Sequence, residues 1–381
     1  MKQLNYGSEN NSSNLQSNPK KKVHIRLNMI VKNEAHVILR CLQSVKPWID
    51  SWVIVDTGST DGTQDIINNF LSDIPGQLFE RSWKNFGFNR TEALQLATTW
   101  DNQRSDYLLF IDADETLLVD ENFKLPDLNE TAYYFKVNYG NLSYRRNALV
   151  STKLSWQWKG VLHEYLDSPQ KHNWHTLEGL TIFVRHDGAR AKTPDTYLKD
   201  ITLLEQGLKD EPDNLRYIFY LAQSYRDAKI LDKSRNFYLE RSNKGGWEEE
   251  RWMAQFRAAQ MAERLGLAHD IVYTEYLQSW IARQQRAEPL YELARYYRSL
   301  KSYDLACYYA DQAVNIERPE DRLFVDASVY DWRALDELSV SATYCKAYRE
   351  KGKLAIHKLV EQRKYPQNQH ERIMGNLKLY C

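Results

Sequence analysis

An apolar run that ends in two carboxylates, residues 107–115 (YLLFIDADE), constrains the fold of this chain more than any other segment. The apolar part has the length and β-forming content of a buried strand in an α/β sheet, and ligands collect at the carboxyl ends of such strands. Asp112 and Asp114 follow it directly, one residue apart. Their oxygens could hold Mg²⁺ or Mn²⁺ and leave coordination positions open for a diphosphate. The alternative is that the aspartates cap a loop, where aspartate is common.

Two further strands are expected upstream. Residues 51–56 (SWVIVD) form a strand ending in Asp56, and residues 57–63 (TGSTDGT) then turn the chain into a helix beginning near Gln64. Glycines permit the turn, and the serine, threonine and aspartate side chains can cap the new helix. Residues 24–31 form a strand before an amphipathic segment at 35–45. This alternation of strands and helices predicts a parallel sheet.

Four motifs resemble those of a known enzyme family. Residues 31–34 (VKNE), 55–63 (VDTGSTDGT), 88–90 (FNR) and 112–114 (DAD) have the order and spacing of family 2 glycosyltransferases with the GT-A nucleotide-diphospho-sugar fold. The resemblance runs from about Val23 to Gly188. The whole chain is similar to a bacterial subgroup in which this domain carries a tetratricopeptide-like helical tail, an architecture similar to that of bacteriocin S-glycosyltransferases. The implied fold class is α/β, a GT-A domain followed by an all-α tetratricopeptide-like repeat domain.

Composition agrees with this class. With 51 basic and 51 acidic residues, the chain gives no reason to expect nucleic acid as a partner. Residues 1–22 are polar and are expected to form a disordered tail. No apolar core follows the N-terminal charges and no apolar stretch approaches the roughly 20 residues that span a bilayer, so we expect a cytoplasmic protein with no secretory signal or transmembrane segment. The four scattered cysteines are expected to be reduced thiols.

The second half has the pattern of helical repeats. Strand-like runs end near residue 193, so the expected domains are 23–192 and 193–381. One set of repeat positions then recurs at helical spacing. The two clearest copies are Ile218, Leu221, Ala222 and Tyr225, and Leu290, Leu293, Ala294 and Tyr297. A weaker copy is expected at 255–262 and another helix pair at 335–360. Stacked repeats form a concave face that could bind the acceptor, a glycan or a polypeptide. Repeat packing accounts for most of the aromatic residues here.

The resemblance also implies donor-site residues. It places Val31, Glu34, Asp56, Arg90 and Asp112 at the nucleotide sugar, with Glu34 and Asp56 holding the nucleoside. A carboxylate such as that of Asp56 can accept from uracil N–H or a ribose hydroxyl. Arg90 would contact the phosphates or brace Asp112, although Thr91 replaces the asparagine that usually follows. The alternative for Arg90 is a surface residue paired with Glu92.

Residues 156–164 (WQWKGVLHE) supply the candidate base. They resemble the aromatic-Gly-x-x-His-Glu segment of the tetratricopeptide-bearing subgroup, which implies that Glu164 deprotonates the acceptor. His163 could serve instead or orient Glu164. A salt-bridged strand end is the alternative. A zinc-protease motif is excluded because Asp167, not histidine, stands four residues after His163.

His186 is a third candidate metal ligand. Residues 181–188 (TIFVRHDG) are expected to form a last strand that ends in His-x-Gly, and GT-A enzymes often recruit a late histidine to the metal. A nitrogen ligand would favour Mn²⁺ somewhat over Mg²⁺. The alternative is a structural histidine whose hydrogen-bond partner is Asp187.

The resemblance implies an inverting glycosyltransferase, and the paired aspartates predict that it depends on a metal. The expected donor is UDP-glucose or UDP-N-acetylglucosamine, and the acceptor is a glycan or a protein side chain. Two alternatives remain. A helical-repeat scaffold protein with an inactive GT-A domain is disfavoured by the intact aspartates. A sugar nucleotidyltransferase would carry a glycine-rich loop after its first strand, and residues 31–35 contain no glycine.

Overall fold

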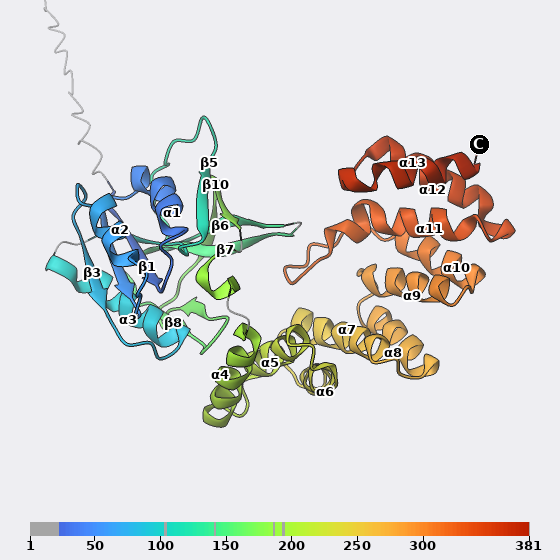
Figure 1. Cartoon of the computed structure of the whole chain (residues 1–381), viewed down its shortest axis with the longest axis horizontal. Coiled ribbons are helices and arrows are strands. Elements are labelled where there is room, and N and C mark those ends of the chain that lie inside the picture. The colour runs from blue at the N-terminus through green and yellow to red at the C-terminus, as the bar shows by residue number, and fades with distance from the viewer. Residues whose placement is uncertain (1–22, 103–104, 141, 186, 193–194, 381) are drawn as a thin grey trace, which may run out of the picture.

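The computed structural model of the chain describes residues 23–102, 105–140, 142–185, 187–192 and 195–380. The predicted polar tail, residues 1–22, lies outside them. The described residues form a sheet domain followed by a helical domain (Figure 1). None of the described helices is long and apolar enough to cross a membrane. Cys41, Cys307 and Cys345 are buried and free, as expected, and Cys381 is outside the described residues.

The first half of the eight-stranded sheet is parallel. Strand β1 (Ile25–Val31) lies between β2 (Ser51–Asp56) and β4 (Tyr107–Phe110), and β3 (Gly76–Glu80) pairs with β2. All residues of β2 and β4 are buried, as in strands covered on both faces. The parallel arrangement predicted for the first strands is confirmed. The connecting helices are α1 (Ile38–Val45), η1 (Lys46–Trp48), α2 (Thr63–Phe70), α3 (Phe86–Thr99) and η2 (Trp100–Asn102).

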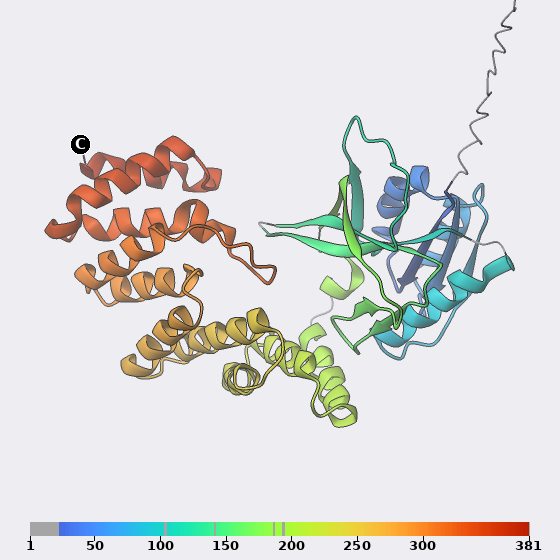
Figure 2. The same ribbon diagram turned by 180° about the vertical axis from the view of Figure 1, so that it is seen from behind.

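The second half of the sheet is mixed, with strand order β4-β7-β6-β10-β5. Strand β7 runs antiparallel to both β4 and β6, whereas β10 runs parallel to β6 and antiparallel to β5. The hairpin of β6 and β7 projects toward the helical domain (Figures 1 and 2). The bounds are β5 (Glu115–Val119), β6 (Ala132–Tyr139), β7 (Leu142–Ser151) and β10 (Trp174–Val184).

A small hairpin of β8 (Gln157–Lys159) and β9 (Tyr165–Asp167) packs against α3. Thr91 replaces the asparagine of the family motif, and its hydroxyl both accepts from the Trp158 amide (3.0 Å) and donates to the Trp158 carbonyl (3.2 Å). The substituted residue therefore fastens the hairpin to the helix.

The helical domain consists of consecutive helices, each packed against the next (Figure 1). The repeat residues predicted from the sequence, including Leu221, Tyr225, Leu293 and Tyr297, are buried between them, so the tetratricopeptide-like pattern is confirmed. The bounds are η3 (Ala189–Lys192), α4 (Thr196–Asp210), α5 (Leu215–Asp227), α6 (Leu231–Ser242), α7 (Glu248–Arg264), α8 (His269–Ala282), α9 (Glu288–Ser299), α10 (Tyr303–Val314), η4 (Val329–Arg333), α11 (Ala334–Ala342), η5 (Lys346–Tyr348), α12 (Arg349–Gln362), η6 (Gln367–Gln369), α13 (His370–Leu377) and η7 (Lys378–Tyr380).

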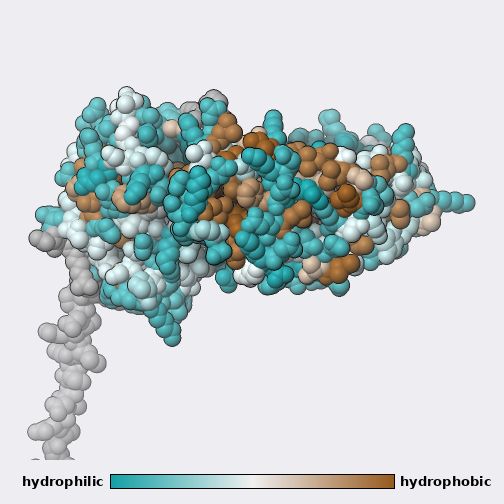
Figure 3. Space-filling view, turned by 90° about the horizontal axis from the view of Figure 1, so that it is seen from below, coloured by the Kyte–Doolittle hydropathy of each residue, from teal (hydrophilic) through white to brown (hydrophobic). Residues whose placement is uncertain are grey.

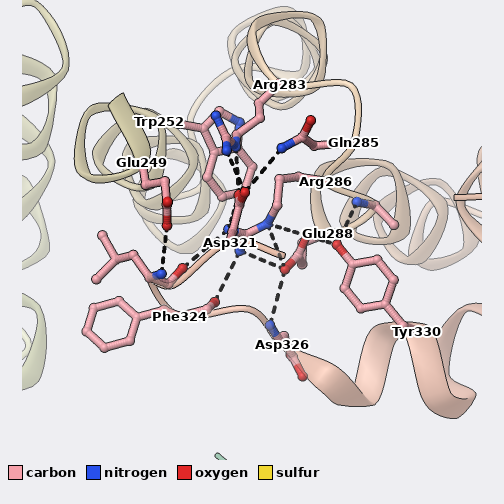
Figure 4. Close-up of polar contacts among 12 residues, drawn as sticks. Glu249, Trp252, Arg283, Gln285, Arg286, Glu288, Asp321, Phe324, Asp326 and Tyr330 are labelled. Carbon is pink, nitrogen blue, oxygen red and sulfur yellow. Dashed lines mark hydrogen bonds and ion pairs between the residues drawn. The ribbon is translucent and has the colours of Figure 1, made fainter. Parts of the chain in front are cut away.

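A buried ionic network fixes the loop that follows α10 (Figure 4). The fully buried Arg286 lies 4.1 Å from the ring centre of Trp252 and pairs with Glu288 (2.8 Å) and Asp321 (3.2 Å). It also donates to the carbonyl of Phe324 (3.1 Å). A buried guanidinium needs such compensation for its lost hydration. Seen from below, apolar residues gather mainly over the helical part of the chain (Figure 3).

Candidate active site

The loops after β1 and β2 meet at the carboxyl edge of the parallel strands. Glu34 donates its backbone amide to Thr63 Oγ1 (2.9 Å), and Thr60 donates its amide to Asn33 Oδ1 (2.8 Å). Val31 is buried, and its carbonyl oxygen accepts from the amide (2.9 Å) and the hydroxyl (3.0 Å) of Thr57. The carbonyl oxygen of Val31 is therefore occupied by the loop, and the donor contact of Val31 stays a prediction.

Asp56 lies where these loops meet, and only one of its two carboxylate oxygens is hydrogen-bonded to the described residues. Its side chain is 1% exposed, and its Oδ1 accepts from the amides of Gly58 and Ser59, both at 2.8 Å. Its Oδ2 is buried and has no hydrogen-bond partner among the described residues. An unsatisfied buried carboxylate oxygen is costly, so it marks a place where a ligand can donate a hydrogen bond.

Asp112 lies between two arginines at the end of β4. Arg90 Nη2 approaches its Oδ1 at 2.6 Å, and Arg146 Nη1 lies 3.7 Å from its Oδ2. Burial opposes ionisation of Asp112, but the two guanidinium groups outweigh burial and hold its pKa below the usual value. Arg90 therefore braces Asp112, one of the two roles predicted for it, and it is not paired with Glu92, which contacts Arg81 instead.

Arg90 also holds Glu164. Its Nε lies 2.5 Å from Glu164 Oε1, and the carboxylate is only 11% exposed. The guanidinium of Arg90, on α3, thus contacts both Asp112, which is predicted to lie near the diphosphate, and Glu164, the predicted base. The expectation that His163 orients Glu164 is replaced, because Arg90 fills that position. The alternative given for this segment was a salt-bridged strand end, and Glu164 does form an ion pair, with Arg90.

His163 faces the helical domain. Its backbone has a positive φ of 51°, and its ring stacks on Tyr220 with 3.9 Å between ring centres. Burial first, then Arg190 and Arg216, lower the pKa of His163 to about 3. Burial and the neighbouring arginines therefore favour the neutral imidazole of His163.

The segment between β8 and β9 is also bound by α5. Arg216 donates twice to the His163 carbonyl, at 3.0 and 2.8 Å, and the Val161 amide donates to Tyr217 Oη (3.1 Å). Leu162 is buried in the core of the helical domain. Contacts from both domains therefore fix the position of Glu164.

Asp114 and Glu34 form the acidic side of the site. Burial, followed by the charge of Asp112, raises the pKa of Asp114. Burial is also the main cause that raises the pKa of Glu34 to about 7, with Asp114 and Asp112 adding to it against the hydrogen bond that Ala189 N donates (3.1 Å). These carboxylates accumulate negative charge that a cation would relieve.

This donor set fits a hard divalent cation. Among the described residues no three His, Cys, Asp or Glu side chains form a ready metal cage. Mg²⁺ commonly binds through one or two carboxylates, with substrate phosphates and water completing its shell. Asp114, together with Asp112, could supply the protein oxygens. The third predicted ligand, His186, lies outside the described residues, and the carboxylate of its proposed partner Asp187 is held by Arg40 at 2.9 and 2.7 Å.

Three arginines were missed from the sequence. Arg146 lies on β7 and donates two hydrogen bonds, of 2.7 and 2.5 Å, to the carboxylate of the buried Glu115. Arg190 follows the last strand, pairs with Asp200 (2.6 Å) and acts electrostatically on Asp112. Arg216 belongs to the helical domain. None lies in a motif, and only the three-dimensional pairing of distant segments brings them to the site.

Gly87 permits the close approach of α3 to the hairpin. A Cβ at this position would lie 2.2 Å from the carbonyl oxygen of Gly160. We expect Gly87→Ala to lower the free energy of unfolding by about 1–3 kcal/mol, as overpacking does, and to reduce activity by separating Arg90 from Glu164. Chemical denaturation measures the first effect. The matched control is the helical Gly375→Ala, whose Cβ meets nothing within 4 Å. Equal stability of the two variants would contradict the close contact.

The family model described as Glycosyl transferase family 2 matches residues 28–185, which make up most of the sheet domain. The sheet domain is therefore similar to family 2 glycosyltransferases, and a helical domain with a tetratricopeptide-like pattern follows it.

Two curated relatives each match a part of the chain. The SPbeta prophage-derived glycosyltransferase SunS of Bacillus subtilis is 27% identical over 237 residues, which are 57% of this chain and 53% of SunS. A TPR repeat-containing protein of Synechococcus elongatus is 28% identical over 208 residues, 50% of this chain and 49% of that protein. The chain therefore spans about half the length of the curated relatives it matches.

Solved structures with similarity include S. aureus TarS in complex with UDP, at 16% identity and a TM-score of 0.27, covering 69% of this chain and 87% of that one. A thermophilic TPR protein of Thermus thermophilus matches at 14% identity and a TM-score of 0.34, covering 48% of this chain and 91% of that one.

Proposed function

We propose that this chain is an inverting glycosyltransferase that moves a sugar from a UDP-sugar to a glycan or polypeptide acceptor with the help of a divalent cation. The observation that carries the proposal is the placement of Arg90, which contacts both Asp112 (2.6 Å) and Glu164 (2.5 Å). The donor phosphates and the acceptor proton would then be handled within one cluster of side chains. The intact carboxylates disfavour an inactive scaffold.

The reaction is a single displacement. The acceptor oxygen or sulfur forms a bond to the anomeric carbon, the bond from that carbon to the diphosphate breaks, and the acceptor proton passes to Glu164. Arg90 and Arg146 face the negative charge that develops on the departing diphosphate. A divalent cation held by Asp112 and Asp114 would supply further charge stabilisation for the leaving group.

Asp56 supports a uridine nucleotide. Its unused, buried Oδ2 is fixed by the hydrogen bonds to Oδ1, and uracil N–H or a ribose hydroxyl could donate to it. Guanine also carries N–H donors, but they stand farther from its ribose than uracil N–H does, so an oxygen fixed to meet uracil does not meet guanine equally well, which costs affinity. We therefore expect UDP to bind more tightly than GDP.

Calorimetry with a panel of nucleotides tests the donor. Wild-type protein should bind UDP more tightly than GDP. Asp56→Asn should weaken UDP binding by about 10- to 100-fold, because the charged acceptor is lost and a buried hydrogen bond to a charged group contributes about 1.5–3 kcal/mol. Asp65→Asn, a change in the first turn of α2, is the control and should bind as wild type does. Equal affinities for GDP and UDP, or unchanged UDP binding by Asp56→Asn, would refute the assignment.

A further inference from the structure

A cavity of about 590 Å³ lies among helices α5, α7, α8 and α9, within the helical domain. Four arginines line it against two glutamates. The arginines are Arg226, Arg257, Arg264 and Arg295, and the glutamates are Glu263 and Glu292. An excess of guanidinium groups around a concave space favours an anionic ligand.

Both glutamates of the cavity wall are hydrogen-bonded to one arginine, Arg295. Arg295 Nε donates to Glu292 Oε2 at 2.6 Å, and Arg295 Nη2 donates to Glu263 Oε1 at 2.6 Å. Tyr276 also donates its hydroxyl hydrogen to Glu263 Oε2 (2.8 Å). The four arginines of the described lining nevertheless outnumber its two glutamates, so the wall keeps an excess of positive charge.

Two of those arginines have no ion-pair partner among the described residues. Arg226 pairs with Asp227 at 2.8 Å, but Arg257 donates only to the neutral Gln260 Oε1 (2.7 Å), and Arg264 only to the sulfur of Met261 (3.9 Å). Burial, and then the charge of Arg226, lower the pKa of Arg257. A half-buried guanidinium without a counter-ion is unfavourable, and an anionic ligand would remove this cost.

A buried hydroxyl lies beside the same charges. Tyr238 of α6 is fully buried, and its hydroxyl has no hydrogen-bond partner among the described residues. Arg226 and Arg257 are the two basic groups whose charges act on that hydroxyl. Tyr238 does not line the cavity, so its hydroxyl adds a buried polar group behind Arg226 and Arg257 and not a ligand contact.

We propose that this cavity binds a carboxylate side chain of a polypeptide acceptor, with Arg257 and Arg264 as ion-pair partners. This inference builds on the proposed sugar transfer by the same chain. The planar guanidinium matches a carboxylate in shape as well as charge. A polypeptide is favoured over a polyanion because Glu263 and Glu292 remain in the wall and would repel repeated negative charges, whereas a peptide presents one carboxylate among neutral amides.

The cavity lies along α5 from the candidate active site. Tyr220, which stacks on His163, and Arg226, which lines the cavity, are six residues apart on this helix. At about 1.5 Å per residue their axial separation is about 9 Å. An extended peptide advances about 3.3 Å per residue, so the acidic residue would stand at least about three residues from the glycosylated one.

Binding of a matched peptide pair to the full-length chain tests the inference, without donor. The probes are acetylated, amidated Gly/Ser heptapeptides that carry one central glutamate or glutamine, measured by saturation-transfer NMR. We expect the glutamate peptide to bind at least about tenfold more tightly, as a charge-assisted hydrogen bond provides. Arg257→Gln should abolish that preference, and so should Arg264→Gln. Arg264 is exposed, so its replacement should leave the fold intact.

Arg251→Gln is the matched control. It lies on the same helix, pairs with Glu248 and does not line the cavity, so the preference should persist. No preference of the wild type for glutamate, or a preference that survives Arg264→Gln, overturns the inference. So does binding of a phosphoserine peptide through Arg264 while the glutamate peptide fails to bind. UDP binding, measured in parallel, separates these outcomes from failure of the proposed function.

Discussion

Replacing Glu164 with glutamine is expected to lower the rate of sugar transfer by about 10²–10⁴-fold, the usual contribution of a general base. Glutamine keeps the size of the side chain and an oxygen that can accept from Arg90 Nε. In the structure, Arg90 Nε lies 2.5 Å from Glu164 Oε1. Only the ability to take the acceptor proton is lost. Single-turnover measurements with saturating donor should therefore show a slower chemical step, while UDP-sugar affinity remains close to its original value.

His163→Ala is the companion variant. Because the His163 ring stacks on Tyr220 and its pKa is lowered to about 3 by burial and the nearby arginines, we expect this change to cost stability more than turnover. A thiol acceptor would reduce the effect of Glu164→Gln, since cysteine is already partly ionised near neutral pH. If His163→Ala abolishes transfer and Glu164→Gln retains it, the base is His163.

Removal of the divalent cation is expected to abolish transfer, and Asp114→Asn should lower turnover by about 10²-fold or more. Charge stabilisation by a metal contributes several kcal/mol, and each 1.36 kcal/mol changes a rate tenfold. Asp114→Asn should leave the fold intact, because burial and Asp112 raise the pKa of Asp114 and so disfavour its charge in the folded chain. Initial rates with Mn²⁺, Mg²⁺ or excess chelator measure the first effect.

Asp73→Asn provides the control for this second prediction. Asp73 is an exposed carboxylate paired with Lys46 at 2.6 Å, remote in sequence from the site motifs. Its variant should retain full, metal-dependent activity. Undiminished transfer in excess chelator, or wild-type turnover by Asp114→Asn, would show that the arginines alone stabilise the leaving group.

Much of the sheet could be predicted because its strands are marked locally. The strand at 51–56 has the predicted bounds, since its apolar residues end at Asp56 and the glycine-containing turn begins there. The first helix begins at Ile38, later than the segment starting at residue 35 suggested, because the amides of Asn33, Glu34 and Ala35 bond to the neighbouring loop instead. Local propensity does not report such tertiary hydrogen bonds.

The candidate site was predictable where motifs carry it and not elsewhere. Asp112, Asp114 and Arg90 stand in motifs and do converge. The partner of Glu164 was misassigned, because the adjacent histidine is nearest in sequence whereas Arg90 is nearest in space. Arg146 reaches Asp112 only because β7 pairs antiparallel with β4, and that pairing has no signature in the residues themselves.

Because the β8–β9 segment is attached to α5, the N-terminal domain alone does not contain all the contacts that position the candidate base. Cutting the chain near residue 193 would expose Leu162, leave the Val161 amide without Tyr217 and free the His163 carbonyl from Arg216. An isolated N-terminal half would therefore hold its general base on a loosened hairpin, even with every sequence motif present. If a ligand bound the helical domain more tightly when these contacts are formed, its binding would favour the ordered hairpin, and the two events would be thermodynamically linked.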